Sequence, residues 1–205
     1  MRRSGRGQLV VMARWPAPGR CKRRLASSLG AAAAARIQAR LTRHTLAVAR
    51  RVSSQLGLEL VLAVDGLGPR AARRWGGALG ADRCLLQGQG GLGLRMHRQF
   101  LRAAAEGAGR VVVIGSDLPR LEGGDLAAAF EALNRRPAVL GPADDGGYWL
   151  LGLRRPDPWL LAGMAWGSAQ VLAQTLAVMA HRGVEPALLP WRGDLDRGED
   201  LRPWR

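Results

Sequence analysis

The sequence has 205 residues, a formal net charge of +15 and two cysteines. Its length suits one domain with a sizeable core, which we expect to span residues 1–205. Cys21 and Cys84 have no partners at metal-ligand spacing, which argues against a zinc site. No apolar run approaches the roughly 20 residues of a membrane span, and the apolar stretch after the basic first residues is too short for a signal peptide. We therefore expect a soluble, cytoplasmic protein without a membrane span.

The positive charge is concentrated in residues 1–110, which carry 21 basic and 4 acidic side chains. Such a field favours an anionic partner. Nucleic acid is not favoured, because thirty of the 31 basic residues are arginine, which indicates a compositional bias, and one Tyr with two Phe offers few stacking surfaces. Lys22 is the single lysine, which suggests that a compact point charge is needed there.

Strands and helices are predicted to alternate along the chain. Apolar runs predict strands at residues 8–13, 58–64, 83–86, 110–115, 138–141, 148–153 and 184–189. Helical spacing predicts helices at residues 30–52, 70–79, 91–105, 125–133 and 169–182, with Asp125 and Ser168 as the caps that open the last two. Residues 110–115 form the clearest strand, because their β-branched run is typical of a central parallel strand. The alternation indicates the α/β class, with three layers and a mainly parallel sheet between two layers of helices.

Ligands of such sheets bind at the carboxyl ends of the strands, where the first strand is followed by ARWPAPGRCKRRL. Prolines and a glycine stiffen this loop, and its backbone N–H groups can face an anion. Its basic side chains can meet two phosphates, arginine through paired donors and lysine as a point charge. The phosphate-binding residues predicted here are Ala13, Pro18, Gly19, Arg20, Lys22 and Arg24. The alternative is a surface loop that is rich in arginine like the rest of the chain.

Asp117 directly follows the clearest strand, in GSDLP. A carboxylate at this position would face the ligand crevice, and Mg²⁺ usually takes one or two carboxylates together with phosphate oxygens of the substrate. Asp117 is therefore the first predicted metal ligand. Its alternative role, capping the next helix, is disfavoured because Asp125 is the better cap.

Two adjacent carboxylates, Asp144 and Asp145, precede two glycines in GPADDGGYW. Glycines let this loop approach a sugar or phosphate closely, and successive side chains in extended backbone point apart. One carboxylate could act as a base or bind sugar hydroxyls while the other fixes the loop; an Asp-Gly turn is the structural alternative. The predicted acceptor-side residues are Gly146, Gly147, Tyr148 and Trp166.

Two further segments contribute candidates. Asp194 and Asp196 lie on one face if the chain is extended there, so Asp196 is predicted as the second metal contact. Arg95 follows a glycine-rich stretch and could reach a phosphate. No pattern in the sequence points to an oligomeric state.

These segments together resemble a family of small bacterial glycosyltransferase-like proteins with the GT-A fold, some of which are described as arsenosugar-biosynthesis glycosyltransferases. The family pattern is similar to ARWPAPGRCKRRL, GSDLPRL, GPADDGGYWLLGL, WGS and DLDRGEDL as they stand here, from Val10 to Leu201. The fold is also similar to that of molybdenum-cofactor and phospholactate nucleotidyltransferases. The sequence departs from the pattern at Arg14, where the family has lysine, and in GLGLRM, where two family acids are missing.

The resemblance implies a nucleotide-diphospho-sugar transferase fold, a nucleotide or nucleotide-sugar donor, Mg²⁺ or Mn²⁺ as cofactor, and a small-molecule acceptor. In the first hypothesis Lys22 binds the phosphates, Asp117 binds the metal, and Asp145 or Asp144 orients or deprotonates an acceptor hydroxyl in glycosyl transfer. The second hypothesis is nucleotidyl transfer with pyrophosphate as the leaving group. The third is a basic RNA-binding module, against which the ordered aspartates at strand ends argue.

Overall fold

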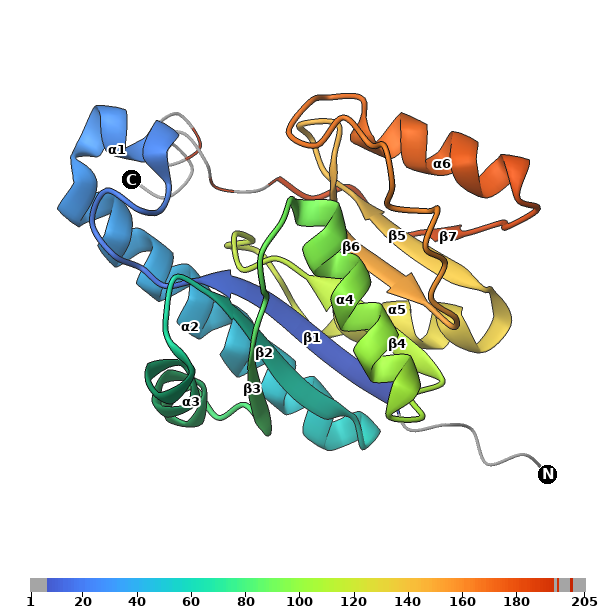
Figure 1. Cartoon of the computed structure of the whole chain (residues 1–205), viewed down its shortest axis with the longest axis horizontal. Helices are drawn as coiled ribbons and strands as arrows, with labels where there is room; N and C mark the ends of the chain where they lie inside the picture. The colour runs from blue at the N-terminus through green and yellow to red at the C-terminus, as the bar shows by residue number, and fades with distance from the viewer. Residues whose placement is uncertain (1–6, 194, 196–199, 201–205) are drawn as a thin grey trace.

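The computed structural model describes residues 7–193, 195 and 200. One sheet of seven strands, in the order β3-β2-β1-β4-β6-β5-β7, forms the middle of the molecule (Figure 1). Its strands are β1 (Gly7–Arg14), β2 (Glu59–Asp65), β3 (Arg83–Leu86), β4 (Arg110–Ile114), β5 (Ala138–Pro142), β6 (Tyr148–Leu153) and β7 (Ala187–Leu188). Most neighbours are parallel, but β6 runs antiparallel to both β4 and β5. The predicted mixed α/β fold with a mainly parallel sheet is confirmed.

Helices cover both faces of the sheet, as the alternation predicts. They are α1 (Arg23–Leu29), α2 (Ala31–Leu56), α3 (Pro69–Ala78), α4 (Leu92–Ala105), α5 (Gly123–Arg135) and α6 (Val171–His181). The central strand β1 shows why two layers are needed. Its Leu9 and Val11 pack among α2, α3 and α5, while Val10 and Met12 pack among α4 and α6. Successive side chains of a strand point to opposite faces of the sheet. A strand that is apolar on both faces therefore has to be covered by helices on both faces.

The structure corrects several sequence-based expectations about element ends. A short helix, α1, lies in front of α2, and Gly30 separates the two with a φ of 80° that glycine readily adopts. The N-cap of α5 is Glu122 and not Asp125, which lies in the first turn and completes a capping box, its Oδ2 accepting the N–H of Glu122 at 3.0 Å. Ser168 does not open α6 either, because its hydroxyl accepts the N–H of Gln170 in a turn before the helix. Within the described residues, no helix is both long and apolar enough to cross a membrane.

Candidate functional site

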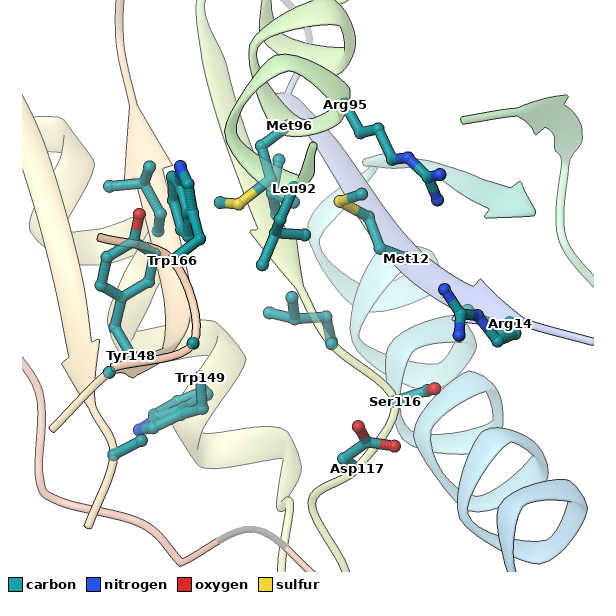
Figure 2. A pocket seen from close by; sticks show the side chains of 18 of the residues that line it. Met12, Arg14, Leu92, Arg95, Met96, Ser116, Asp117, Tyr148, Trp149 and Trp166 are labelled. Atoms are coloured by element: carbon teal, nitrogen blue, oxygen red, sulfur yellow. The ribbon is translucent and has the colours of Figure 1, made fainter. Parts of the chain in front are cut away.

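A cavity of about 700 Å³ opens at the carboxyl ends of β1, β2 and β4 (Figure 2). Because β6 runs in the opposite direction, it contributes its first residues, beginning at Tyr148, to the same edge. The volume falls within the range of small-molecule and cofactor sites, which is roughly 300–1,000 Å³. The topology therefore gathers at one place most of the segments that the sequence marks as polar strand ends.

The loop after β1 turns away from the cavity before it returns. Trp15 donates its N–H to the carbonyl of Asp65 at 2.8 Å, and a tight turn follows in which Gly19 has a φ of 75°. This turn carries Pro18, Gly19 and Arg20 outward, and none of them lines the cavity. Arg24, on the first turn of α1, is likewise absent from the lining.

Lys22 brings the chain back into the cavity in an unusual conformation. Its φ of 46° and ψ of 50° are left-handed, and among the described residues it is the only non-glycine residue with a positive φ. Such a backbone costs on the order of 1–3 kcal/mol and persists where the surroundings enforce it, often at functional sites. The Lys22 side chain is only 3% exposed. The backbone strain thus directs one buried ammonium group into the site.

Asp117 forms an ion pair with the ammonium group of Lys22. The Nζ atom of Lys22 lies 3.2 Å from Oδ1 of Asp117, while the Asp117 side chain as a whole is 44% exposed. The Oδ1 atom itself is buried, so the exposed part of the carboxylate includes the other oxygen. In Figure 2 the carboxylate of Asp117 and the hydroxyl of Ser116 lie at the end of β4 beside the cavity.

Residues 190–193 and Leu195 form what we call the C-terminal strap, which continues from β7 toward the α1 side of the molecule (Figure 1). Leu195 is buried and packs against α1 and α2. Its N–H donates to the carbonyl of Asp117 at 3.0 Å, and its carbonyl accepts a hydrogen bond from Nζ of Lys22. The strap therefore contacts both members of the Lys22–Asp117 pair.

Arg192 fastens the strap to the rest of the fold. Its Nη2 lies 2.6 Å from Oδ1 of Asp125, whose side chain is 6% exposed, and this hydrogen bond raises the pKa of the guanidinium. Its backbone pairs with the end of β5, donating to Pro142 at 3.1 Å and accepting from Asp144 at 3.3 Å.

A second charged cluster lies at the ends of β1 and β2. Oδ2 of Asp65 is 2.9 Å from Nη2 of Arg14 and 3.0 Å from Nη1 of Arg95. Burial raises the pKa of Asp65, but the hydrogen bonds and charges of Arg95 and Arg14 outweigh it and hold the pKa below its ordinary value. Gln87 supports the cluster by donating to the carbonyls of Ala13 and Ala63 at 3.2 and 3.0 Å. Of these cluster residues, only Arg95 was predicted from the sequence.

The two adjacent aspartates lie in a turn between β5 and β6, in which Gly146 donates its N–H to the carbonyl of Ala143 at 3.0 Å, and not in the extended backbone expected from the sequence. Asp145 lines the cavity and accepts the N–H of Gly147 on Oδ1 at 2.9 Å. Asp144 lies outside the lining, with its carboxylate close to Gly193 of the strap. Gly146 has a φ of 83°, and a Cβ there would lie 2.2 Å from the carbonyl oxygen of Ala169, so glycine is required.

Several predicted site residues meet in the cavity, and several do not. Those that line it are Ala13, Lys22, Arg95, Asp117, Asp145, Gly147, Tyr148 and Trp166. Those that the structure places outside the lining are Pro18, Gly19, Arg20, Arg24, Asp144 and Gly146. Asp194 and Asp196 lie outside the described residues. The lining also includes residues that sequence reasoning missed, chiefly Met12, Arg14, Gln38, Asp65, Gln87, Leu92, Met96 and Ser116.

The residues present fit a divalent cation only in part. No group of three or more His, Cys, Asp or Glu side chains could hold an ion within the part of the chain that the structure describes. Asp117 nevertheless presents exposed carboxylate surface to the cavity, and Mg²⁺ commonly uses one or two protein carboxylates plus phosphate oxygens and water. The exposed carboxylate of Asp117 therefore suits an ion that arrives with a phosphorylated ligand.

The fold is that of the nucleotide-diphospho-sugar transferases. The crystal structure of a protein from Desulfovibrio desulfuricans G20, assigned to that class, matches with a TM-score of 0.81 and 29% identity, covering 93% of this chain and 82% of that one. A family described as an uncharacterized protein conserved in bacteria (DUF2064) matches residues 45–168, and the chain belongs to it.

Two further similarities involve characterised chemistry. A phosphoenolpyruvate guanylyltransferase from Chloroflexus aggregans is 29% identical over 188 residues, which is 89% of this chain and 90% of that protein. Glucosyl-3-phosphoglycerate synthase from Mycobacterium tuberculosis, in complex with Mn²⁺, UDP and glucosyl-3-phosphoglycerate, has a TM-score of 0.57 at 14% identity, over 96% of this chain and 74% of that one. The latter likeness concerns the fold alone.

Proposed function

We propose that this protein is a divalent-cation-dependent transferase that binds a nucleotide diphosphate-sugar and moves the sugar to a small-molecule acceptor. The observation that carries the proposal is the buried Lys22 ammonium, 3.2 Å from an Asp117 carboxylate that is partly exposed to a cavity at the strand ends. A cation and a metal-binding carboxylate side by side are the two groups that a diphosphate leaving group needs. We also propose that residues 1–205 act as one domain, because a single sheet carries both walls of the cavity.

In this proposal the donor diphosphate lies between Lys22 and Asp117. Asp117 would hold Mg²⁺ or Mn²⁺ through its exposed oxygen together with diphosphate oxygens, and the ion would neutralise charge that develops as the diphosphate leaves. Lys22 would donate to the same diphosphate as a point charge, and its burial strengthens that interaction because the local dielectric is low. Asp196 remains a candidate for a second contact to the ion.

Asp145 is the proposed base on the acceptor side, because it lines the cavity on the loop that leads into Tyr148. It would accept the proton of an acceptor hydroxyl as that oxygen forms a bond to the anomeric carbon of the sugar. The bond from that carbon to the diphosphate oxygen breaks at the same centre, and the nucleoside diphosphate leaves with the electron pair. Asp144, whose carboxylate lies beside Gly193, is not assigned a role in this step.

The test compares wild type, Asp117→Asn and a matched control, Glu131→Gln, which removes a carboxylate from an exposed helical ion pair. Nucleoside diphosphate release from a panel of nucleotide sugars should depend on Mg²⁺ or Mn²⁺ in wild type and in the control. Asp117→Asn should lose at least ~10²-fold in kcat/KM, the cost of removing one group that stabilises developing charge. Turnover that is unaffected by Asp117→Asn would refute the metal role.

Nucleotidyl transfer is the second candidate function, favoured by the similarity to the guanylyltransferase along 89% of the chain. Here a phosphate of the acceptor would attack the α-phosphorus of a nucleoside triphosphate, and pyrophosphate would leave. The same two residues, Lys22 and Asp117, would have the same roles toward the phosphates and the ion in this reaction. Pyrophosphate release from nucleoside triphosphates, measured beside diphosphate release from nucleotide sugars, separates the two candidates.

A further inference from the structure

The wall of the cavity away from the charged pair is apolar (Figure 2). Trp166, Leu92 and Met96 gather on this wall, and Met12 lies between them and Arg14. Tyr148 stands beside Trp166, with ring centroids 6.2 Å apart and an interplanar angle of 77°. We call this set the apolar wall; its members are Met12, Leu92, Met96, Tyr148 and Trp166.

The aromatic residues at the cavity turn their polar atoms away from it. A Cβ built on Gly93 of α4 would lie 2.6 Å from Nε1 of Trp166, so the indole N–H edge packs under that helix. Trp149 directs its Nε1 to the carbonyl of Pro190 at 3.4 Å. The Tyr148 hydroxyl is buried near Thr175 of α6 without reaching hydrogen-bond geometry, and burial raises its pKa. The surface that these aromatic residues present to the cavity therefore consists of ring faces and of ring edges without polar atoms.

The side chains of Arg14 and Arg95 point away from Trp166 (Figure 2). Arg14 and Arg95 pair with Asp65, and Lys22 pairs with Asp117. Among the described residues, the apolar wall carries no lysine, arginine or histidine. A carboxylate or phosphate placed against the rings and alkyl chains of this wall would lose its hydration without a cationic side chain of the wall beside it, which is costly. A sugar would likewise leave the hydroxyls that face these five side chains without partners.

We propose that the acceptor is an alcohol carried on an aromatic or alkyl body, and that this body lies against the apolar wall. The inference rests on the proposed function, because it assigns the phosphate-binding side of the cavity to the donor. Asp145 lines the cavity next to the wall, on the loop that enters Tyr148, so a hydroxyl at the end of such a body would reach the proposed base. The acceptor class follows from what the wall can and cannot bind.

Leu92 and Leu94 give a matched pair of variants. Both are exposed leucines in the first turn of α4, at 47% and 54% exposure, but only Leu92 lines the cavity. Aspartate is tolerated in the first turn of a helix, where the dipole favours it, so Leu92→Asp and Leu94→Asp should both fold. Leu92→Asn separates the loss of apolar contact from the addition of charge.

A binding experiment tests the wall independently of catalysis. The neutral fluorophore N-phenyl-1-naphthylamine, which the arginine-rich surface does not attract by charge, should be displaced by 2-phenylethanol and not by glycerol or glycerol 3-phosphate. Leu92→Asp and Leu92→Asn should raise the apparent Kd for 2-phenylethanol by ~10-fold, the lower end of what one pocket contact commonly contributes, and Leu94→Asp should leave it unchanged. Displacement by glycerol 3-phosphate, or equal effects of both positions, would overturn the proposal.

Donor binding distinguishes a failed acceptor proposal from a failed function. A nucleotide-sugar panel with Mn²⁺ should raise the Tm of wild type and of Leu92→Asp alike, since a ligand of the folded form stabilises it. A donor shift without displacement by 2-phenylethanol rejects the apolar acceptor and keeps the proposed function. Displacement without any donor shift rejects the proposed function and leaves an apolar binding site.

Discussion

The ammonium of Lys22 lies 3.2 Å from Oδ1 of Asp117, and both residues are joined to Leu195, one through its carbonyl and the other through its N–H. The loop after β1, the end of β4 and the C-terminal strap therefore form one connected unit at the cavity. Because the Lys22 side chain is 3% exposed and its backbone is left-handed, the unit leaves the ammonium little freedom. This rigidity has consequences that can be measured.

Lys22→Met keeps most of the length of the side chain and removes its charge. We expect kcat/KM to fall by ~10²-fold or more, because a preorganised donor to developing charge is lost. Lys22→Arg should not rescue activity, since a planar guanidinium differs in shape and hydration from the compact ammonium that fits this buried slot. Arg20→Gln, on the outward turn of the same loop, is the control and should retain activity. Full activity in Lys22→Arg would contradict this account of the buried slot.

Arg192→Ala should loosen the C-terminal strap. The variant leaves Asp125 buried without its cation, which we expect to lower the free energy of unfolding by about 1–3 kcal/mol. Since the strap contacts both Lys22 and Asp117, the KM for the donor should rise at the same time. Urea unfolding and steady-state kinetics measure the two effects. Arg135→Ala, which breaks a pair whose side chains are 80% and 60% exposed, should change stability by about 0.5 kcal/mol or less. Equal effects of the two variants would argue against the fastening role of Arg192.

Glu106 predicts a pH dependence of stability that is separate from the site. Hydrogen bonds from Arg83 and Gln8, with the charge of Arg102, outweigh burial and lower its pKa from 4.5 to about 2. A carboxylate with a depressed folded-state pKa stabilises the fold above its unfolded pKa, and that stabilisation is lost as pH falls through the folded pKa. Wild type should therefore lose this contribution between pH 4.5 and about 2.

Urea unfolding of wild type and Glu106→Gln at several pH values checks this prediction. The variant should be less stable than wild type at pH 7, and the difference should shrink in acid. The effect should be modest, because the Glu106 side chain is 33% exposed and solvent screens its ion pairs. A difference in stability that is the same at pH 7 and pH 2.5 would contradict the assignment.

Gly93→Ala should destabilise the protein although alanine favours helices. The added Cβ would lie 2.6 Å from the carbonyl oxygen of Leu161 and 2.6 Å from Nε1 of Trp166, so backbone or indole must shift. We expect a loss of about 1–3 kcal/mol, typical of overpacking. Gly77→Ala in α3 meets no atom within 4 Å and should stabilise by about 0.5–1 kcal/mol. Thermal unfolding compares the stabilities of the two variants. A Gly93→Ala variant as stable as Gly77→Ala would contradict the prediction, because the neighbours of the added Cβ would then have moved without a cost in stability.

Much of the fold follows from apolar patterning. The continuous β-branched run of β4 predicts a central strand, because a strand buried on both faces is apolar at every position. The apolar residues at helical spacing in 91–105 predict α4, because a helix buried on one face is apolar once per turn. Helix α1 escaped prediction, since seven residues are too few to show a period. Strand β7 is shorter than its apolar run, because it covers only Ala187 and Leu188, which stand in register with Val139 and Leu140 of β5.

The candidate site was predictable where residue type and strand end coincide. Asp117 and Asp145 stand out as carboxylates directly after or before strands, and the cavity includes both. Arg20 and Arg24 could not be separated from Arg14 by sequence, because the turn at Gly19 decides which arginines face inward. Gln87 and Asp65 become recognisable only through their partners, which come from β1, β2 and α4. Nothing in the local sequence indicates those contacts.

The reversed direction of β6 bears on how such proteins can diversify. The side of the cavity that holds Lys22 and Asp117 is built by the loop after β1 and the end of β4 and is backed by the strap, whereas the apolar wall draws on the start of β6, the turn around Trp166 and the first residues of α4. Substitutions among the side chains of the apolar wall can therefore reshape one side of the cavity while the other keeps its geometry. Under the proposed function, a library confined to Leu92, Met96, Tyr148 and Trp166 would explore new acceptors at constant donor affinity, and engineers could retarget the scaffold by that route.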